Sequence, residues 1–193
     1  MKHKNNKPVP LIIITSIAAL VILVSMVDVK QVDGRSMEPY LEKNRTVLIC
    51  RAAYGLMLPF TGTYLFHWSS IQPGDIIVYK NPASRERVVK QCVAVGGDPF
   101  ELQGNVITFN TTLRGPAADP PDKMTFTVSR HTAGSLRELE VLPEGCVFAV
   151  GVNLEVSVDS RHYGCIPHGA VIGRVVFPVS RGYNSNIRAA RGK

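Results

Sequence analysis

An uncharged stretch near the N-terminus constrains this chain more than any other feature of its sequence. No Asp, Glu, Lys or Arg occurs from Pro8 to Val27, and the residues from Leu11 onward are almost all apolar. Such a segment approaches the roughly 20 residues that an α-helix needs to cross a bilayer. We therefore expect a transmembrane anchor at residues 11–27 and one folded domain at residues 30–180.

The charges around this segment predict its orientation. Lysines precede it and Asp28 follows it, which favours a cytoplasmic N-terminus. Residues 1–10 are then a short basic cytoplasmic segment, and a single-pass protein of the cytoplasmic (inner) membrane carries its domain outside, on the periplasmic side. A cleavable signal peptide is the alternative, but Ser25-Met26-Val27-Asp28 makes a poor small-x-small cleavage site.

The net charge of +7 does not indicate a nucleic-acid partner. Seven basic residues at the two ends of the chain account for all of it, and the domain between them is formally neutral. Residues 181–193 are predicted to be a basic, flexible tail. The seven residues are Lys2, Lys4, Lys7, Arg181, Arg188, Arg191 and Lys193.

Short β-prone runs separated by Gly and Pro follow the apolar segment, and no long helical pattern is present. Seven such runs predict a mainly β fold, namely an antiparallel, barrel-like domain behind one N-terminal transmembrane helix. Residues 114–123, with three prolines, read as a surface loop. The predicted strands are Thr46–Arg51, Asp75–Lys80, Arg87–Val95, Val106–Asn110, Thr125–Ser129, Cys146–Val150 and Val171–Val176.

The aromatic segment from Tyr54 to Trp68 is open to two interpretations. It is apolar but broken by two glycines and a proline, so it reads equally as a loop and strand of the core or as a patch in the membrane interface.

The four cysteines show no C-x-x-C spacing, so a structural zinc site is not expected. An outward-facing domain permits disulfides, and buried free thiols are the alternative. Of the pairings, Cys146 with Cys165 is favoured because both flank the region of Asp159. The histidines show no metal spacing, and no metal or cofactor is expected.

Two stretches carry residues suited to nucleophilic catalysis. Ser36 follows Gly34 in a turn whose backbone N–H groups can face a ligand, and Pro39 restricts the exit path. Lys90 is the one charged residue among Val88, Cys92 and Ala94, which alternation places on one strand face. A buried lysine readily loses its proton and can then act as a general base, whereas a lysine at a sheet edge reaches water instead.

A third stretch places Ser157, Asp159 and Arg161 at alternate positions, so that all three can face one way. Asp159 and Arg161 could then form an ion pair with Ser157 beside them, and the alternative is an ordinary polar loop. A triad of His162, Ser36 and Asp159 is the weaker reading of the same residues.

Together these stretches resemble the bacterial type I signal peptidases, or leader peptidases, over Val32 to about Val176. Ser36-Met37 is similar to their nucleophile box, and Val88-Val89-Lys90 followed by Asp98 to their general-base box. The last box is matched by Ser157-x-Asp159-Ser160-Arg161-x-x-Gly164. Tyr54-Gly55, Pro73 to Lys80 and Gly169 to Arg174 match the segments between and after these boxes.

The resemblance implies a Ser36–Lys90 dyad that cuts signal peptides from exported preproteins at the membrane lipid surface, through an acyl-enzyme. It assigns Ser157 to orient Lys90, and Asp159 with Arg161 to brace the loop. Backbone N–H groups at Ser36 and Gly34 are the expected oxyanion donors. Shallow apolar pockets for an Ala-x-Ala site would be lined by Val32, Met37, Leu41, Val89 and Val158.

Departures from the family pattern keep further functions open. Val152 and Leu154 stand where the family usually has Asp and often Arg, which favours a specialised peptidase that matures pilin-like or other exported subunits of a conjugation or secretion system. The alternative from another class is a catalytically inactive, membrane-anchored β-rich binding module for exported subunits. A self-cleaving protein is a third reading, against which the anchor argues.

Overall fold

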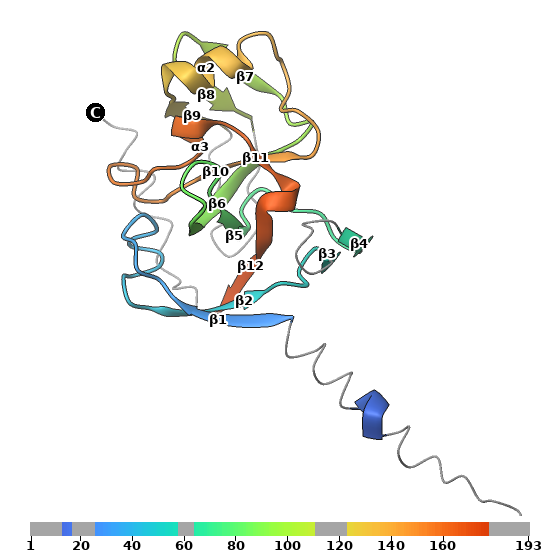
Figure 1. The fold of residues 1–193 in the computed structure, drawn as a ribbon. Helices are drawn as coiled ribbons and strands as arrows, with labels where there is room; N and C mark the ends of the chain where they lie inside the picture. Colours follow the sequence, from blue (N-terminus) through green and yellow to red (C-terminus); the bar gives the residue numbers. More distant parts are fainter. Residues whose placement is uncertain (1–12, 17–25, 58–63, 111–122, 178–193) are drawn as a thin grey trace, which may run out of the picture.

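The computed structural model describes residues 13–16, 26–57, 64–110 and 123–177. Within these residues the chain is mainly β, as its turn-rich sequence predicts. Seven strands form one open antiparallel sheet, which is shown in Figure 1 and has β1 and β11 at its edges. In order across the sheet these strands are β1 (Val27–Gln31), β2 (Thr46–Cys50), β12 (Val171–Phe177), β5 (Ile76–Lys80), β6 (Arg87–Val95), β10 (Cys146–Val150) and β11 (Ile166–Pro167).

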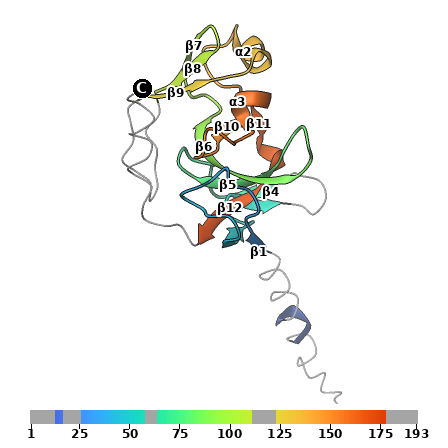
Figure 2. The same cartoon turned by 90° about the vertical axis from the view of Figure 1, so that its left-hand side faces the viewer.

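A smaller three-stranded sheet covers the end of the molecule opposite β1 (Figures 1 and 2). Its hairpins place Phe109 in the core, where the Phe109 and Phe148 ring centroids lie 5.0 Å apart. The helix α2 packs beside it, with Ala133 and Leu136 buried in the same hydrophobic cluster. The elements are β7 (Phe100–Gln103), β8 (Val106–Phe109), β9 (Met124–Thr127) and α2 (Arg130–Leu136).

All seven predicted strands are present, with every boundary within two residues of the prediction. The sequence did not reveal α2, whose start is stabilised by Ser129: its Oγ accepts a hydrogen bond from the Thr132 N–H at 3.0 Å. Three short elements near the C-terminal end also escaped prediction, namely α3 (Ser160–Tyr163), β11 and η1 (His168–Ala170).

The strands β3 (Gly55–Met57) and β4 (Tyr64–His67) pair as a two-stranded sheet within the aromatic segment. Residues 58–63 of this segment lie outside the described residues. The side chains of Phe66 and Trp68 are 64% and 56% exposed, so this part of the segment faces outward instead of filling the core. Tyr54 is 2% exposed and lies in the core, so the core interpretation is right for Tyr54 and wrong for Phe66 and Trp68, and the membrane interface stays a prediction.

Much of the predicted topology falls on residues that the structure does not describe. Residues 1–10, 17–25 and 181–193 are among them, as is most of the predicted loop at 114–123. Residues 13–16 are helical, and Val27 is the first residue of β1. Among the described residues, no helix combines the length and the apolar character needed to cross a bilayer.

Lys90 lies on an interior strand of the large sheet. β6 lies between β5 and β10, and Lys90 pairs with Ile77 of β5. An adjoining contact fixes β12 against β5: Asp75 accepts a hydrogen bond from the Tyr54 hydroxyl at 2.9 Å and lies 3.4 Å from the Arg174 guanidinium. Tyr54, Asp75 and Arg174, which the sequence matched to family segments, thus serve the packing of the sheet.

Candidate active site

Ser36 lies in the turn between β1 and β2, and its neighbours hold it in place. Met37, Tyr40 and Leu41 are buried in one hydrophobic cluster with residues of β2 and β5, whereas Ser36 itself is partly exposed. The Leu41 N–H donates to the Met37 carbonyl at 2.8 Å, which closes the turn. The sequence therefore fixes the backbone of the turn by burial and leaves the serine hydroxyl accessible.

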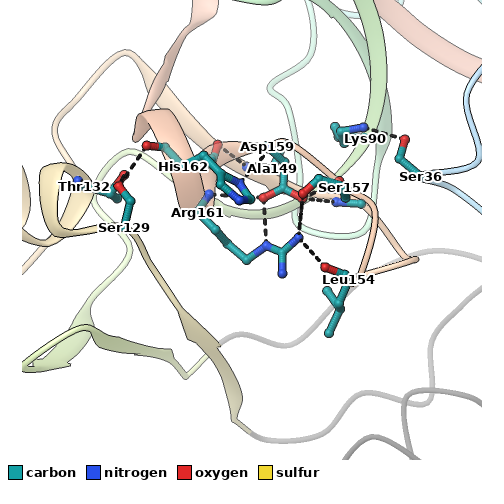
Figure 3. Close-up of polar contacts among 12 residues, drawn as sticks. Ser36, Lys90, Ser129, Thr132, Ala149, Leu154, Ser157, Asp159, Arg161 and His162 are labelled. Atoms are coloured by element: carbon teal, nitrogen blue, oxygen red, sulfur yellow. Dashed lines mark hydrogen bonds and ion pairs between the residues drawn. The ribbon is translucent and has the colours of Figure 1, made fainter.

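The Lys90 amine meets this hydroxyl directly, with Nζ 2.6 Å from Ser36 Oγ (Figure 3). Lys90 is only 4% exposed, although its side chain carries a charge in water. Burial lowers the pKa of Lys90 to about 8, while the charge of Asp159 raises it and that of Arg161 lowers it by smaller amounts. A substantial fraction of Lys90 is therefore neutral near pH 8 and able to accept a proton.

Asp159 is the centre of a second polar cluster and is fully buried. Its Oδ2 accepts hydrogen bonds from Gly151 N at 2.9 Å, Ser157 Oγ at 2.5 Å and Arg161 Nη2 at 3.0 Å, and its Oδ1 accepts from Arg161 Nε at 2.9 Å (Figure 3). Burial raises the pKa of Asp159, but the hydrogen bonds from Arg161, Ser157 and Gly151 outweigh it, so the net shift is downward. The carboxylate is thus charged at neutral pH.

The sequence predicted this alternation of Ser157, Asp159 and Arg161, and the structure brings the three side chains together. The hydroxyl of Ser157 donates to Asp159, and its expected role toward Lys90 stays a prediction. Arg161 also donates through Nη2 to the carbonyls of Leu154 at 3.1 Å and Ser157 at 3.0 Å. One guanidinium therefore ties both arms of the loop to the buried carboxylate.

Asp159 also caps α3, which places the neighbouring residues. His162 Nδ1 accepts from the Asp159 N–H at 3.4 Å in a capping box. Ser160 Oγ accepts from the Ala149 N–H at 3.0 Å, which joins α3 to β10. His162 thus contacts the backbone of Asp159, and the geometry favours the Ser36–Lys90 pair over a His162 triad.

Gly151 joins the two clusters, and sequence reasoning did not single it out. An ideal Cβ at Gly151 would lie 2.2 Å from Ser157 Oγ and 2.6 Å from the Ser36 carbonyl oxygen. The Asn153 N–H donates to the same Ser36 carbonyl at 2.9 Å. Only glycine allows this approach, so the loop that carries Asp159 packs directly on the backbone of Ser36. The sequence signal that could have identified Gly151 is its position directly after the predicted strand at Cys146–Val150.

Replacing Gly151 by alanine is expected to reduce peptide cleavage by about 10²-fold, because the added methyl group must push the loop away from Ser36. Kinetics of the purified variant would measure the loss. Gly134→Ala is the matched control, since a Cβ there meets no atom within 4 Å and α2 should gain helix stability. Equal activity of the Gly151 and Gly134 variants would contradict this account of the loop.

The two expected oxyanion donors are the backbone N–H groups of Gly34 and of Ser36, the predicted nucleophile. An ideal Cβ on Gly34 would be 3.9 Å from Ser36 Oγ, an ordinary contact distance. Within the described residues, the backbone N–H groups of Gly34 and Ser36 donate to no protein acceptor. Their role as oxyanion donors stays a prediction.

The five predicted pocket residues lie in different surroundings. Val32, Met37 and Leu41 are buried in the hydrophobic cluster, and Val89 packs against it while partly buried. Val158 is 59% exposed. Val152, which the prediction did not include, also packs against this cluster. The lining of a substrate pocket stays a prediction. The described residues contain no group of three or more His, Cys, Asp or Glu side chains suited to a metal ion.

Several known proteins are similar in sequence to this chain. The family described as "Signal peptidase, peptidase S26" matches residues 6–180. Signal peptidase I of Bacillus caldolyticus is 27% identical over 150 residues, which cover 76% of this chain and 75% of that protein. Mitochondrial inner membrane protease subunit 1 of Xenopus tropicalis is 29% identical over 147 residues, or 76% of this chain and 65% of that protein.

Among solved structures, a crystal structure of a signal peptidase I from Enterococcus faecalis is similar, with a TM-score of 0.37 and 20% sequence identity. The match covers 56% of this chain and 98% of that one.

Proposed function

The chain belongs to the peptidase S26 family of signal peptidases, and from this premise we propose that it is a membrane-anchored serine endopeptidase that removes N-terminal signal or leader peptides from exported proteins. The observation that carries the proposal is the 2.6 Å contact between Lys90 Nζ and Ser36 Oγ. A buried amine beside a partly exposed hydroxyl can supply the general base and the nucleophile of acyl transfer without a histidine.

In the acylation step, neutral Lys90 accepts the proton of the Ser36 hydroxyl while Oγ attacks the scissile carbonyl carbon. The carbonyl oxygen becomes an oxyanion, which the N–H groups of Ser36 and Gly34 stabilise. Lys90 then returns the proton to the leaving amine as the C–N bond breaks. The product that leaves is the mature protein, and the signal peptide remains as an ester on Ser36.

In the deacylation step, Lys90 is neutral again and accepts a proton from water, which attacks the ester carbonyl. The tetrahedral intermediate collapses, Ser36 regains its proton from Lys90, and the signal peptide leaves with a new carboxylate. Throughout, Asp159 and Arg161 are positioning residues, because they hold Ser157 beside Gly151, and Gly151 lies against the backbone of Ser36.

The substrate belongs to the class of preproteins with small residues before the cleaved bond. The departures from the family pattern favour a narrower substrate specificity within this class. Val152 is apolar where the family usually has Asp, and it packs against the cluster that contains Met37 and Leu41. Leu154 is 40% exposed beside Arg161. These two residues support a dedicated substrate, such as a pilin-like subunit of a conjugation or secretion system.

The proposed site of action is the outer face of the cytoplasmic membrane, with the N-terminus inside and residues 11–27 as the anchor. The uncharged stretch and the lysines before it support this topology. Exposed apolar side chains at Val29, Phe66 and Trp68 support contact of the domain with the lipid surface.

Cleavage is expected to depend on pH through Lys90. Only neutral Lys90 can accept the serine proton, and the pKa of Lys90 is about 8. The value of kcat/KM for a preprotein should therefore rise about tenfold for each pH unit well below pH 8 and become constant above it. Rates measured from pH 6 to 9.5 in detergent micelles test this proposal. A rate that stays constant from pH 6 to 9 would show that Lys90 is not the base.

A further inference from the structure

Two of the four cysteines lie at the edge of the large sheet, where β10 pairs with β11. Cys146 is the first residue of β10, and Cys165 directly precedes β11, which pairs with β10 in the register Cys146–Pro167 and Val147–Ile166. Cys165 therefore lies two residues from the register partner of Cys146, which places both side chains on one face of the strand pair, and Cys165 packs against the hydrophobic cluster that contains Cys146. All four cysteines are free thiols in this structure.

The remaining two cysteines have other surroundings. Cys92 is fully buried in β6, and its thiol donates to the Ala94 carbonyl at 3.6 Å. Cys50 ends β2, which is separated from β10 by three other strands of the sheet. Strand pairing therefore brings Cys146 and Cys165 together and keeps Cys50 away from both.

The segment between Cys146 and Cys165 contains the whole loop that supports the candidate active site. It includes Gly151, which packs on the Ser36 carbonyl, and Asp159, which holds the loop together. A bond between its two ends would restrict the unfolded chain and limit opening of this loop in the folded protein.

We propose that Cys146 and Cys165 form a disulfide bond once the domain is outside the cytoplasm, and that this bond holds the Gly151–Arg161 loop against Ser36. The inference rests on the proposed function only for the placement of the domain in an oxidising compartment, where disulfides persist. The oxidant is a disulfide of the thiol–disulfide exchange class, such as oxidised glutathione or an exported dithiol oxidase.

The chemistry fits the different exposure of the two thiols. Cys165 is partly exposed, and its interaction with the Cys146 thiol lowers its pKa, so its thiolate can attack the oxidant disulfide and release one oxidant thiol. Buried Cys146 then loses its proton and attacks the mixed disulfide at Cys165, which releases the second oxidant thiol. Two electrons and two protons pass from the cysteine pair to the oxidant.

Thiol counting on the full chain tests this proposal. Membranes are quenched with acid, denatured, and labelled with a maleimide–polyethylene glycol before and after reduction. We expect two labelled thiols before reduction, Cys50 and Cys92, and four after it. Non-reducing peptide mapping should find the Cys146 and Cys165 peptides joined, which identifies the pair without any substitution.

Single-cysteine variants distinguish a Cys146–Cys165 bond from pairings that involve Cys50 or Cys92. Cys165→Ser should show three labelled thiols with or without reduction, whereas Cys50→Ser should show one before reduction and three after. Reduction should lower the melting temperature of the wild-type protein by roughly 5–10 °C and leave that of a Cys146→Ser/Cys165→Ser variant unchanged.

Four labelled thiols in membranes and again after treatment of the purified protein with oxidised glutathione would overturn the proposal. If glutathione forms the bond in the purified protein while the protein in membranes stays reduced, the pairing stands and the placement outside the cytoplasm fails. Because thiol counting needs no substrate, an inactive protein with two protected thiols would contradict the proposed peptidase function alone.

Discussion

Replacing Lys90 by methionine is expected to abolish peptide cleavage and, in the same protein, to raise the free energy of unfolding. Without the amine no group accepts the Ser36 proton, so kcat/KM should fall at least about 10⁴-fold. Methionine has a similar volume but no charge to bury. A variant that is both more stable and inactive is the signature of a buried catalytic base.

The gain in stability follows from the lowered pKa of Lys90. In the unfolded chain its pKa is the ordinary 10.5, and in the folded protein it is about 8. At pH 7 the charged amine is therefore less stable in the folded protein by about 3 kcal/mol, at about 1.4 kcal/mol for each tenfold change in proton affinity. This penalty is complete below pH 8 and disappears as the pH rises from 8 to 10.5.

Urea denaturation at pH 7 and at pH 10, together with a cleavage assay, measures both effects. The advantage of Lys90→Met should be largest at pH 7 and smaller at pH 10. Lys80→Met is the matched control, because Lys80 is exposed at the end of β5 and should change neither stability nor rate. A Lys90→Met protein that is less stable than the wild type at pH 7 would contradict the assignment.

The second large effect concerns Asp159, whose replacement by alanine should destabilise the fold by about 3–5 kcal/mol. The carboxylate is fully buried and accepts hydrogen bonds from Gly151, Ser157 and Arg161, all of which lose their partner in the variant. Because the pKa of Asp159 is lowered, its contribution is present at neutral pH and is lost only in acid. Cleavage should fall with it, since the loop no longer holds Ser36.

Urea denaturation at pH 7 measures this loss, and Glu155→Ala is the matched control on the same loop. Glu155 is exposed, so its replacement should alter the free energy of unfolding by less than about 0.5 kcal/mol. An Asp159→Ala protein as stable as the Glu155→Ala protein would show that the ion pair with Arg161 does not brace the loop.

The strands were predictable because their signals are local. Gly and Pro punctuate the chain between β-branched runs, and each predicted strand is present. β1 was not predicted, because it is a largely exposed edge strand that forms by pairing with β2. α2 was not predicted either, since it is short and contains Thr, Gly and Ser, and its stability comes from the Ser129 cap and three buried residues.

The expected single face of β6 is only partly right. Val88 and Cys92 pack in one cluster, but Ala94 packs in another, with Phe148 and Val93. The register between β6 and β10 shifts between Phe148 and Ala149, so that one residue of β6 is skipped and the alternation changes beyond it. A bulge depends on the partner strand, which the sequence of β6 alone does not reveal.

In the candidate site too, contacts between residues close in sequence were predictable and contacts between distant segments were not. Asp159 and Arg161 are close in sequence, and their alternation was enough to predict the ion pair. The contact of Ser36 with Lys90 joins distant segments, and only the family resemblance predicted it. The close approach of Gly151 to Ser36 requires the folded backbone, because glycine in a loop signals a turn as readily as a tight contact.

The most direct test of the Ser36–Lys90 peptidase is cleavage of a preprotein with an Ala-x-Ala site in detergent micelles at pH 8.5, comparing the wild-type chain with Ser36→Ala. The wild-type protein should release the mature product with a new N-terminus directly after that site, and Ser36→Ala should release none. Equal cleavage by both proteins would place the nucleophile elsewhere. A preprotein left intact by the wild-type chain would contradict a general signal peptidase and favour a dedicated substrate first, then the inactive binding module.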